Sequence, residues 1–222
     1  MEKKLPWITV LLVGSVWGFF EATLGGLLHF SPTPIAGRVM APIAFAILYL
    51  GMKNDLKARH IFCASLIAAA FKGLDPFLFH MPFLSNGILN PVLHNRVIYP
   101  VFAIVTQGLG FAVVSSPLRK VSQSFSKTAL WAIPVYPLSL LAFCLISIFV
   151  FHRQPKALSE GMLGLVSYTA LRTGLTIVMI SLARMWVQRA WYLDFSLLSL
   201  PVRLGATAGF AVLATVAKVV LV

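Results

Sequence analysis

Residues 5–28 read LPWITVLLVGSVWGFFEATLGGLL, and this stretch decides the fold class. Its only charged residue is Glu21, and about 20 such apolar residues in an α-helix cross the hydrocarbon of a bilayer. Lys3 and Lys4 precede it, as basic residues precede the apolar part of a signal peptide. The run is too long for a signal peptide and lacks a clean small-x-small cleavage site, so we expect an uncleaved first membrane span.

The rest of the chain has the same character. Of its 222 residues, 59% are hydrophobic and 11% are charged, whereas a soluble domain carries about 25% charged residues. The apolar residues form long runs rather than the short alternating segments of a β-barrel. We therefore predict one all-α domain over residues 1–222, a polytopic transmembrane helical bundle. The runs expected to span are 5–28, 35–52, 61–74, 97–116, 129–151, 162–183 and 204–222. The third run is short and the seventh carries Lys218, so the prediction is six to seven spans.

Basic residues lie at alternate ends of these runs. Clusters precede the first run and follow the second, fourth and sixth; their members are Lys3, Lys4, Lys53, Lys57, Arg59, Arg119, Lys120, Lys127, Arg184 and Arg189. If every run spans, these clusters share one side, which the positive-inside rule makes cytoplasmic. The N-terminus is then cytoplasmic, and the net charge of +12 reflects topology rather than nucleic-acid binding. We expect an integral protein of the bacterial cytoplasmic (inner) membrane.

The opposite, outer side carries a Pro-rich broken segment. Residues 76–95 include Pro76, Pro82 and Pro91, and proline interrupts a helix because it lacks the backbone N–H. Irregular backbone at membrane depth needs protein or water to satisfy its polar groups. We interpret the segment as re-entrant or lid-like.

Under this topology the ionisable residues within or beside the spans gather in the outer half of the bundle. Glu21 and Arg172 are the deepest, where a charge is most unfavourable. The cationic side chains outnumber the acids, and a surplus of buried positive charge favours an anionic group such as a carboxylate or phosphate. We expect a pocket, open to the outside, for a small anionic or amphipathic solute. The candidate substrate-binding residues are Glu21, His29, Arg38, Lys72, Asp75, His94, Arg96 and Arg172.

Other interpretations of these residues stay open. Glu21 and Arg172 can form a buried ion pair that locks two helices, and the charges nearer the interface can be ordinary anchors. His29, His80 and His94 can converge with the acids on a metal ion, but no two of them have the helical spacing of a ligand pair. We therefore expect no metal and no cofactor.

Small residues recur every four positions in the first run, at Gly14, Gly18, Ala22 and Gly26. Such a stripe lets another helix approach closely, either inside the bundle or from a partner membrane subunit.

The stripe, the cytoplasmic N-terminus and the polar outer side together resemble the substrate-binding S components of energy-coupling-factor (ECF) vitamin transporters. The resemblance is architectural and covers the first six runs; a seventh span departs from the six-helix pattern of that family. It implies that Gly14, Gly18 and Ala22 dock on a membrane coupling subunit that works with ATPases. It also implies a lid over the ligand, which on this chain would be residues 29–37 together with residues 76–95.

A membrane transport protein, or its substrate-binding subunit, is the function that these features favour. One alternative is an intramembrane enzyme acting on a lipid-like substrate, with Glu21, Asp75 or a histidine as acid or base. We find no Ser-His-Asp arrangement, His-Glu-x-x-His motif or paired aspartates on adjacent spans, so no catalytic residue is assigned. The other alternative is a structural or assembly subunit of a membrane complex, with an apolar lateral face and no pocket.

Overall fold

The structure, a computed structural model, describes residues 6–25, 28, 36–78, 84–85, 88–90, 94–121, 124–159, 161–188, 202, 205–209 and 212–213. Nearly all of these residues are helical. The helices are α1 (Pro6–Phe20), α3 (Ala36–Lys53), α4 (Ala58–Gly73), α5 (Asp75–Leu78), α7 (Tyr99–Val121), α8 (Phe125–Ala132), α9 (Val135–Phe149), α10 (Lys156–Ser159) and α11 (Gly161–Gln188). Two π-helical segments, η1 (Glu21–Gly25) and η2 (His94–Ile98), continue α1 and precede α7. A two-residue antiparallel ladder pairs β1 (Leu84–Ser85) with β2 (Ile88–Leu89).

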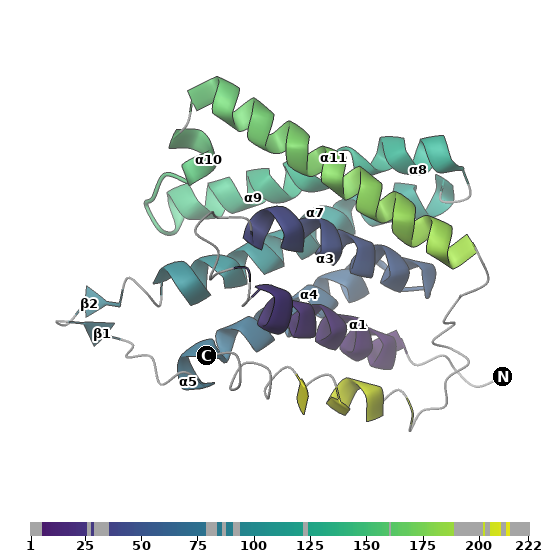
Figure 1. Cartoon of the computed structure of the whole chain (residues 1–222), viewed down its shortest axis with the longest axis horizontal. Helices are drawn as coiled ribbons and strands as arrows, with labels where there is room; N and C mark the ends of the chain where they lie inside the picture. The colour runs from purple at the N-terminus through teal and green to yellow at the C-terminus, as the bar shows by residue number, and fades with distance from the viewer. Residues whose placement is uncertain are drawn as a thin grey trace.

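The long helices lie side by side as a bundle (Figure 1). Helix α4 packs between α1 and α7, α11 packs on α3, and α7 packs on α9. The start of α1 and helix α8 lie at one end of the bundle, whereas α10 and the β1–β2 ladder lie at the other (Figure 1). The predicted all-α bundle is confirmed at this level.

Four helical stretches are long and apolar enough to cross a membrane: Pro6–Gly25, Arg96–Val121, Phe125–Phe149 and Gly161–Met185. They correspond to the first, fourth, fifth and sixth apolar runs. The second and third runs form α3 and α4, which have 18 and 16 residues. Most of the seventh run lies outside the described residues. The structure therefore supports an integral membrane protein, and the full count of spans stays a prediction.

Proline sets the local irregularities. Pro137 has no N–H to offer the carbonyl of Ile133, and Pro134 crowds the turn before it, so the fifth run divides into α8 and α9. Pro100 likewise leaves the Arg96 carbonyl without its usual partner, at the place where η2 passes into α7. In the Pro-rich segment 76–95, the described residues form the end of α5, the β1–β2 ladder and η2 rather than one continuous helix.

The core lies between α1, α3, α4 and α7. Its largest fully buried side chains include Trp17, Phe45, Tyr49 and Phe111, and the Phe45 and Phe111 rings stack with centroids 6.2 Å apart. On the other side of the bundle, α11 crosses α3 and α9 obliquely (Figure 1). This helix keeps a strongly exposed apolar surface. Leu163 is 86% exposed, which suits a helix in contact with lipid.

The small-residue stripe of α1 is turned inward. A Cβ added at Gly14 would lie 2.7 Å from Ile67 Cβ, and one added at Gly18 would lie 2.7 Å from the Phe71 ring. Ala22 is also buried. The stripe could serve contact inside the bundle or contact with a partner subunit. At Gly14 and Gly18 the contact is inside the bundle, because α4 covers them.

Candidate functional site

A cavity of about 470 Å³ lies among η1, α3, α7, α9 and α11. Sites for small molecules have volumes of roughly 300–1,000 Å³, so the cavity is large enough for a metabolite. Its polar lining residues are Glu21, Tyr99, Thr106, Gln107, Tyr136, Ser139, Ser147, Gln154, Tyr168 and Arg172. The remaining lining residues are Gly25, Gly37, Met40, Pro100, Ala103, Ile104, Leu140, Phe143 and Pro155.

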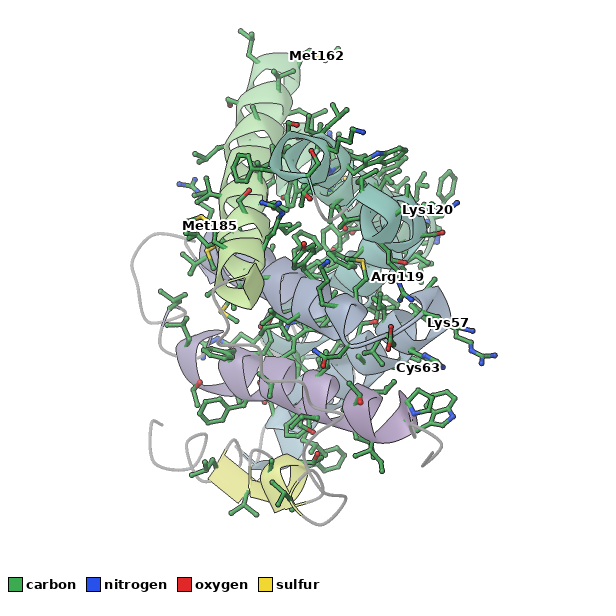
Figure 2. The ribbon with its side chains drawn as sticks, turned by 90° about the vertical axis from the view of Figure 1, so that its right-hand side faces the viewer. Lys57, Cys63, Arg119, Lys120, Met162 and Met185 are labelled. Atoms are coloured by element: carbon green, nitrogen blue, oxygen red, sulfur yellow. The ribbon has the colours of Figure 1, made fainter. Side chains whose placement is uncertain are left out.

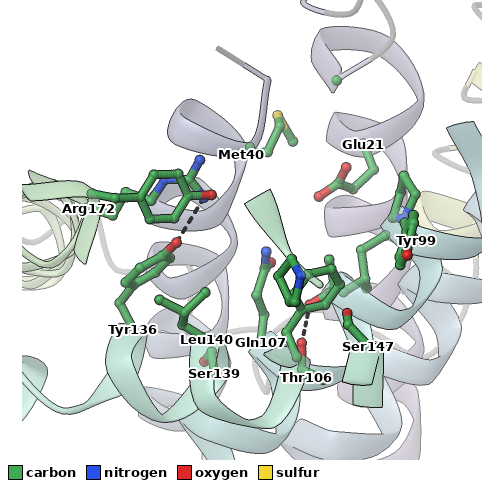
Figure 3. A pocket seen from close by; sticks show the side chains of 18 of the residues that line it. Glu21, Met40, Tyr99, Thr106, Gln107, Tyr136, Ser139, Leu140, Ser147 and Arg172 are labelled. Carbon is green, nitrogen blue, oxygen red and sulfur yellow. Dashed lines mark hydrogen bonds between the residues drawn. The ribbon is translucent and has the colours of Figure 1, made fainter. Parts of the chain in front are cut away.

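Arg172 projects from α11 into one side of the cavity (Figure 3) and is only 9% exposed. Its Nη1 donates a 2.8 Å hydrogen bond to the hydroxyl of Tyr136 on α9. Its Cζ lies 3.8 Å from the centre of the Tyr168 ring, a close cation–π contact one turn earlier on the same helix. The Nε atom is buried and has no hydrogen-bond partner. Uncharged groups therefore hold the guanidinium in place, and its Nε–H donor has no acceptor.

Glu21 lies on the opposite side of the cavity from Arg172 (Figure 3). It is the first residue of η1, and its Oε1 accepts a 3.2 Å hydrogen bond from Nε1 of Trp17. A Cβ at Gly25 would lie 3.2 Å from the other carboxylate oxygen, so glycine there leaves the carboxylate room. π-Helical turns are rare and frequent at functional sites, because they re-aim a side chain within a helix. Glu21 and Arg172 do not pair with each other, so the buried ion pair considered above does not form.

Two further polar atoms of the lining have no partner. They are Oε1 of Gln107 on α7 and Oγ of Ser147 on α9, both buried. By contrast, the hydroxyls of Thr106 and Ser139 bond to carbonyls of their own helices, at 3.0 and 2.8 Å. Buried polar groups are nearly always satisfied, so unpartnered ones that line a cavity indicate that something else meets them. Gln107 and Ser147 are not among the site residues expected from the sequence. The feature that could have indicated them is that each is a polar residue inside an apolar run.

Four of the other expected site residues are absent from the described lining of the cavity. Lys72 and Asp75 form a buried ion pair of 2.7 Å at the end of α4, and neither lines the cavity. Arg38 and Arg96 are exposed and do not line it either. These two arginines are close to helix ends, where a long side chain reaches the interface as an anchor.

Two of the expected site residues are histidines, His29 and His94. His29 and the side chain of His94 lie outside the described residues. The same holds for residues 29–35, the larger part of the expected lid segment 29–37. Within the part of the chain that the structure describes, no group of three His, Cys, Asp or Glu residues could hold a metal ion. The expected positive surplus is also absent from the described lining, which has one arginine and one glutamate.

Comparison of the chain with protein-family models, with curated proteins and with solved structures found no match.

Proposed function

We propose that this chain is a membrane transport protein, or the substrate-binding subunit of one, that binds a small anionic or amphipathic solute in the cavity. The observation that carries the proposal is the state of Arg172. Its guanidinium is buried at the cavity wall, bonds to a neutral hydroxyl and keeps an unpartnered Nε.

The energetics of a buried guanidinium support an anionic group on the solute. Arginine stays protonated in proteins, so Arg172 cannot lower the cost of burial by losing its charge. A carboxylate or phosphate at the cavity would supply the missing charge and accept from the planar N–H fork. The stacking of Arg172 on Tyr168 orients that fork before the solute arrives, which reduces the entropy lost on binding.

The proposed orientation puts the N-terminus in the cytoplasm of a bacterial cell. Lys57, Arg119 and Lys120 lie near one another at one end of the bundle (Figure 2), and Arg119 donates to the carbonyl of Leu56. A basic end of this kind fits the positive-inside rule. Residues Gln154 and Pro155 line the cavity and belong to the connection before α10, at the other end. The cavity would then open toward the outside.

An ECF-like transporter would add a membrane coupling subunit and ATPases as partners. Gly14 and Gly18 are covered by α4, so a docking surface for such a subunit would have to lie elsewhere on the bundle. The exposed apolar side of α11 is equally compatible with lipid, and it does not by itself favour the structural-subunit alternative.

Binding to the purified full chain tests the function. The protein is placed in nanodiscs, and thermal shift is measured against a panel of small carboxylates and phosphates. We expect a stabilising anion whose effect is lost in Arg172→Ala and strongly reduced in Arg172→Lys, because a point charge does not replace the planar fork. Arg96→Ala is the control, since this arginine is exposed and does not line the cavity. Equal stabilisation of wild type and Arg172→Ala would overturn the proposal.

Cysteine labelling tests the orientation. Asp55→Cys and His152→Cys place single thiols in the α3–α4 and α9–α10 connections, after the natural Cys63 and Cys144 are replaced by Ser. A membrane-impermeant maleimide added to intact cells should label position 152 and spare position 55. The reverse pattern would invert the proposed topology.

A further inference from the structure

The guanidinium of Arg172 lies beside the N-terminal turn of α3, and from this we infer that the cavity binds a phosphate group at this place. The phosphate is shared between the N–H fork of Arg172 and the first backbone N–H groups of α3, at Gly37. The inference rests on the proposed function and narrows its substrate class from an anionic or amphipathic solute to a phosphate monoester.

Gly37 fixes the position of Arg172 relative to α3. A Cβ added at Gly37 would lie 3.6 Å from Nη1 and 3.7 Å from Nη2 of Arg172. Gly37 is the second residue of α3, and both Gly37 and Arg172 line the cavity. Figure 3 shows Arg172 and Met40, which is one turn after Gly37, facing the same space. The fork of the guanidinium is therefore next to the first turn of an 18-residue helix.

The helix dipole makes this placement unfavourable for a cation. The N-terminus of an α-helix carries a partial positive charge, because its first N–H groups have no acceptor within the helix. Cations are favourable at the opposite end of a helix, so the dipole of α3 opposes a guanidinium at its start. Arg172 is only 9% exposed, so salt and water screen this repulsion weakly. An anion between Arg172 and α3 would be attracted by both.

The side chain of Arg172 indicates a ligand independently of the helix terminus. Within the described part of the chain, its guanidinium contacts the Tyr136 hydroxyl and the rings of Tyr136 and Tyr168, none of which carries a negative charge. Its Nε is buried and has no hydrogen-bond partner. Buried charges in proteins are normally paired. These neutral contacts orient the guanidinium without neutralising it.

The arrangement of donors distinguishes a phosphate from a carboxylate. A carboxylate has two oxygens in one plane, and the fork of an arginine can take both of them. The N–H groups at the start of α3 belong to a second element, so they need a further acceptor. A phosphate monoester has three terminal oxygens in a tetrahedral arrangement and a charge of about −1.5 to −2 at neutral pH. It can accept from Arg172 and α3 together, as phosphates do at other helix N-termini that glycine opens to the ligand.

The experiment compares matched probes on the full chain in nanodiscs of phosphatidylcholine. Phenyl phosphate is matched with benzoate and butyl phosphate with pentanoate, because apolar lining residues such as Leu140 and Phe143 suit a short organic group. Binding is measured by calorimetry. We expect at least one phosphate to bind about 10- to 100-fold more tightly than its matched carboxylate, the effect of one added charge-assisted hydrogen bond. Failure of both phosphates to bind, or equal binding of phosphates and carboxylates, would overturn the inference.

Substitutions at Gly37 test the contribution of α3. Gly37 is exposed, so a short side chain there does not disturb the core. Gly37→Asp places a carboxylate beside the guanidinium and at the helix N-terminus, so the chain itself supplies the negative charge that the phosphate would bring. Gly37→Asn is the matched control, with the same size and no charge. The Asp variant should have the higher ligand-free melting temperature and should lose phosphate binding. A Gly37→Asp variant that binds phenyl phosphate as the wild type does would overturn the inference.

The outcomes separate this inference from the proposed function. One result is Arg172-dependent binding of carboxylates and phosphates with equal affinity, unchanged in Gly37→Asp. It would overturn the phosphate site and leave the anion site of the proposed function standing. Loss of Arg172 dependence for every anion would overturn both.

A phosphate monoester can also be a lipid headgroup, and the membrane composition distinguishes the two sources. Phosphatidic acid has a phosphate monoester as its headgroup, whereas phosphatidylglycerol, added in the same amount to other nanodiscs, is an anionic phosphodiester. Phosphatidic acid should weaken the binding of phenyl phosphate more than phosphatidylglycerol does if the site takes a headgroup. The two lipids should have equal effects if the site takes a free solute. Both results support a phosphate ligand and assign its origin.

Discussion

Nη1 of Arg172 on α11 and the hydroxyl of Tyr136 on α9 are joined by a hydrogen bond of 2.8 Å, the contact that sets where the cation points. It connects two helices that otherwise form different walls of the cavity. The guanidinium is stacked on Tyr168 at the same time, so its plane and its direction are both determined by neutral aromatic residues. An arginine held in this way keeps its full charge for a ligand.

Tyr136→Phe should weaken binding of the stabilising anion by about 10- to 100-fold, because hydrogen bonds to charged groups contribute roughly 1.5–3 kcal/mol. The phenylalanine ring keeps the packing and removes only the acceptor that orients Nη1. Calorimetric titration of the purified variant measures the change. Tyr49→Phe is a matched control, since Tyr49 is fully buried in the core and does not line the cavity. An equal loss of affinity in both variants would contradict a specific role for Tyr136.

Ser147→Ala should raise the free energy of unfolding of the ligand-free protein by about 1 kcal/mol while it lowers solute affinity. The reason is that Oγ of Ser147 is buried without a partner, and such a group is destabilising until a ligand meets it. Thr176→Val is the control, because the Thr176 hydroxyl is also buried and unpartnered but does not line the cavity. We expect Thr176→Val to stabilise the protein without any change in affinity.

Gly14→Ala should lower the free energy of unfolding by about 1–3 kcal/mol, the usual effect of overpacking. The new Cβ would lie 2.8 Å from the backbone oxygen of Ala64 on α4, which cannot rotate out of the way. Gly174→Ala is the matched control in α11, because no atom lies within 4 Å of its added Cβ and alanine favours the helix. Unfolding in mixed detergent micelles, followed by circular dichroism, measures both. An unchanged stability of Gly14→Ala would return the stripe to the partner-docking interpretation.

Lys72→Met should destabilise the protein by about 3 kcal/mol, since it leaves the buried carboxylate of Asp75 without its 2.7 Å partner. The double variant Lys72→Met/Asp75→Asn should lose less than the sum of the two single variants, as expected for residues in direct contact. The same unfolding assay completes this cycle. Because neither residue lines the cavity, solute affinity should stay at the wild-type value. A tenfold change in affinity would instead place the pair in the site.

The site could be foreseen in part. Glu21 and Arg172 stood out in the sequence because each is an ionisable residue well inside a run that prefers hydrocarbon. Gln107 and Ser147 did not stand out, since isolated polar residues in apolar helices usually bond to their own backbone, as Ser139 does. Only the packed structure separates a hydroxyl that bonds locally from one that faces a cavity.

By itself, the sequence determined that this protein is an all-helical chain with apolar helices of membrane-spanning length, because hydrophobicity and proline positions act locally along the chain. It also determined how far along its helix each charge lies, since the rise per residue is constant. The sequence shows which side chains share a face of a helix, but not which neighbouring helix or cavity that face meets. Tertiary packing therefore decided that Arg172 and Glu21 face a common cavity and that Lys72 pairs with Asp75 outside its lining. It also left Arg38 and Arg96 exposed and outside the described lining.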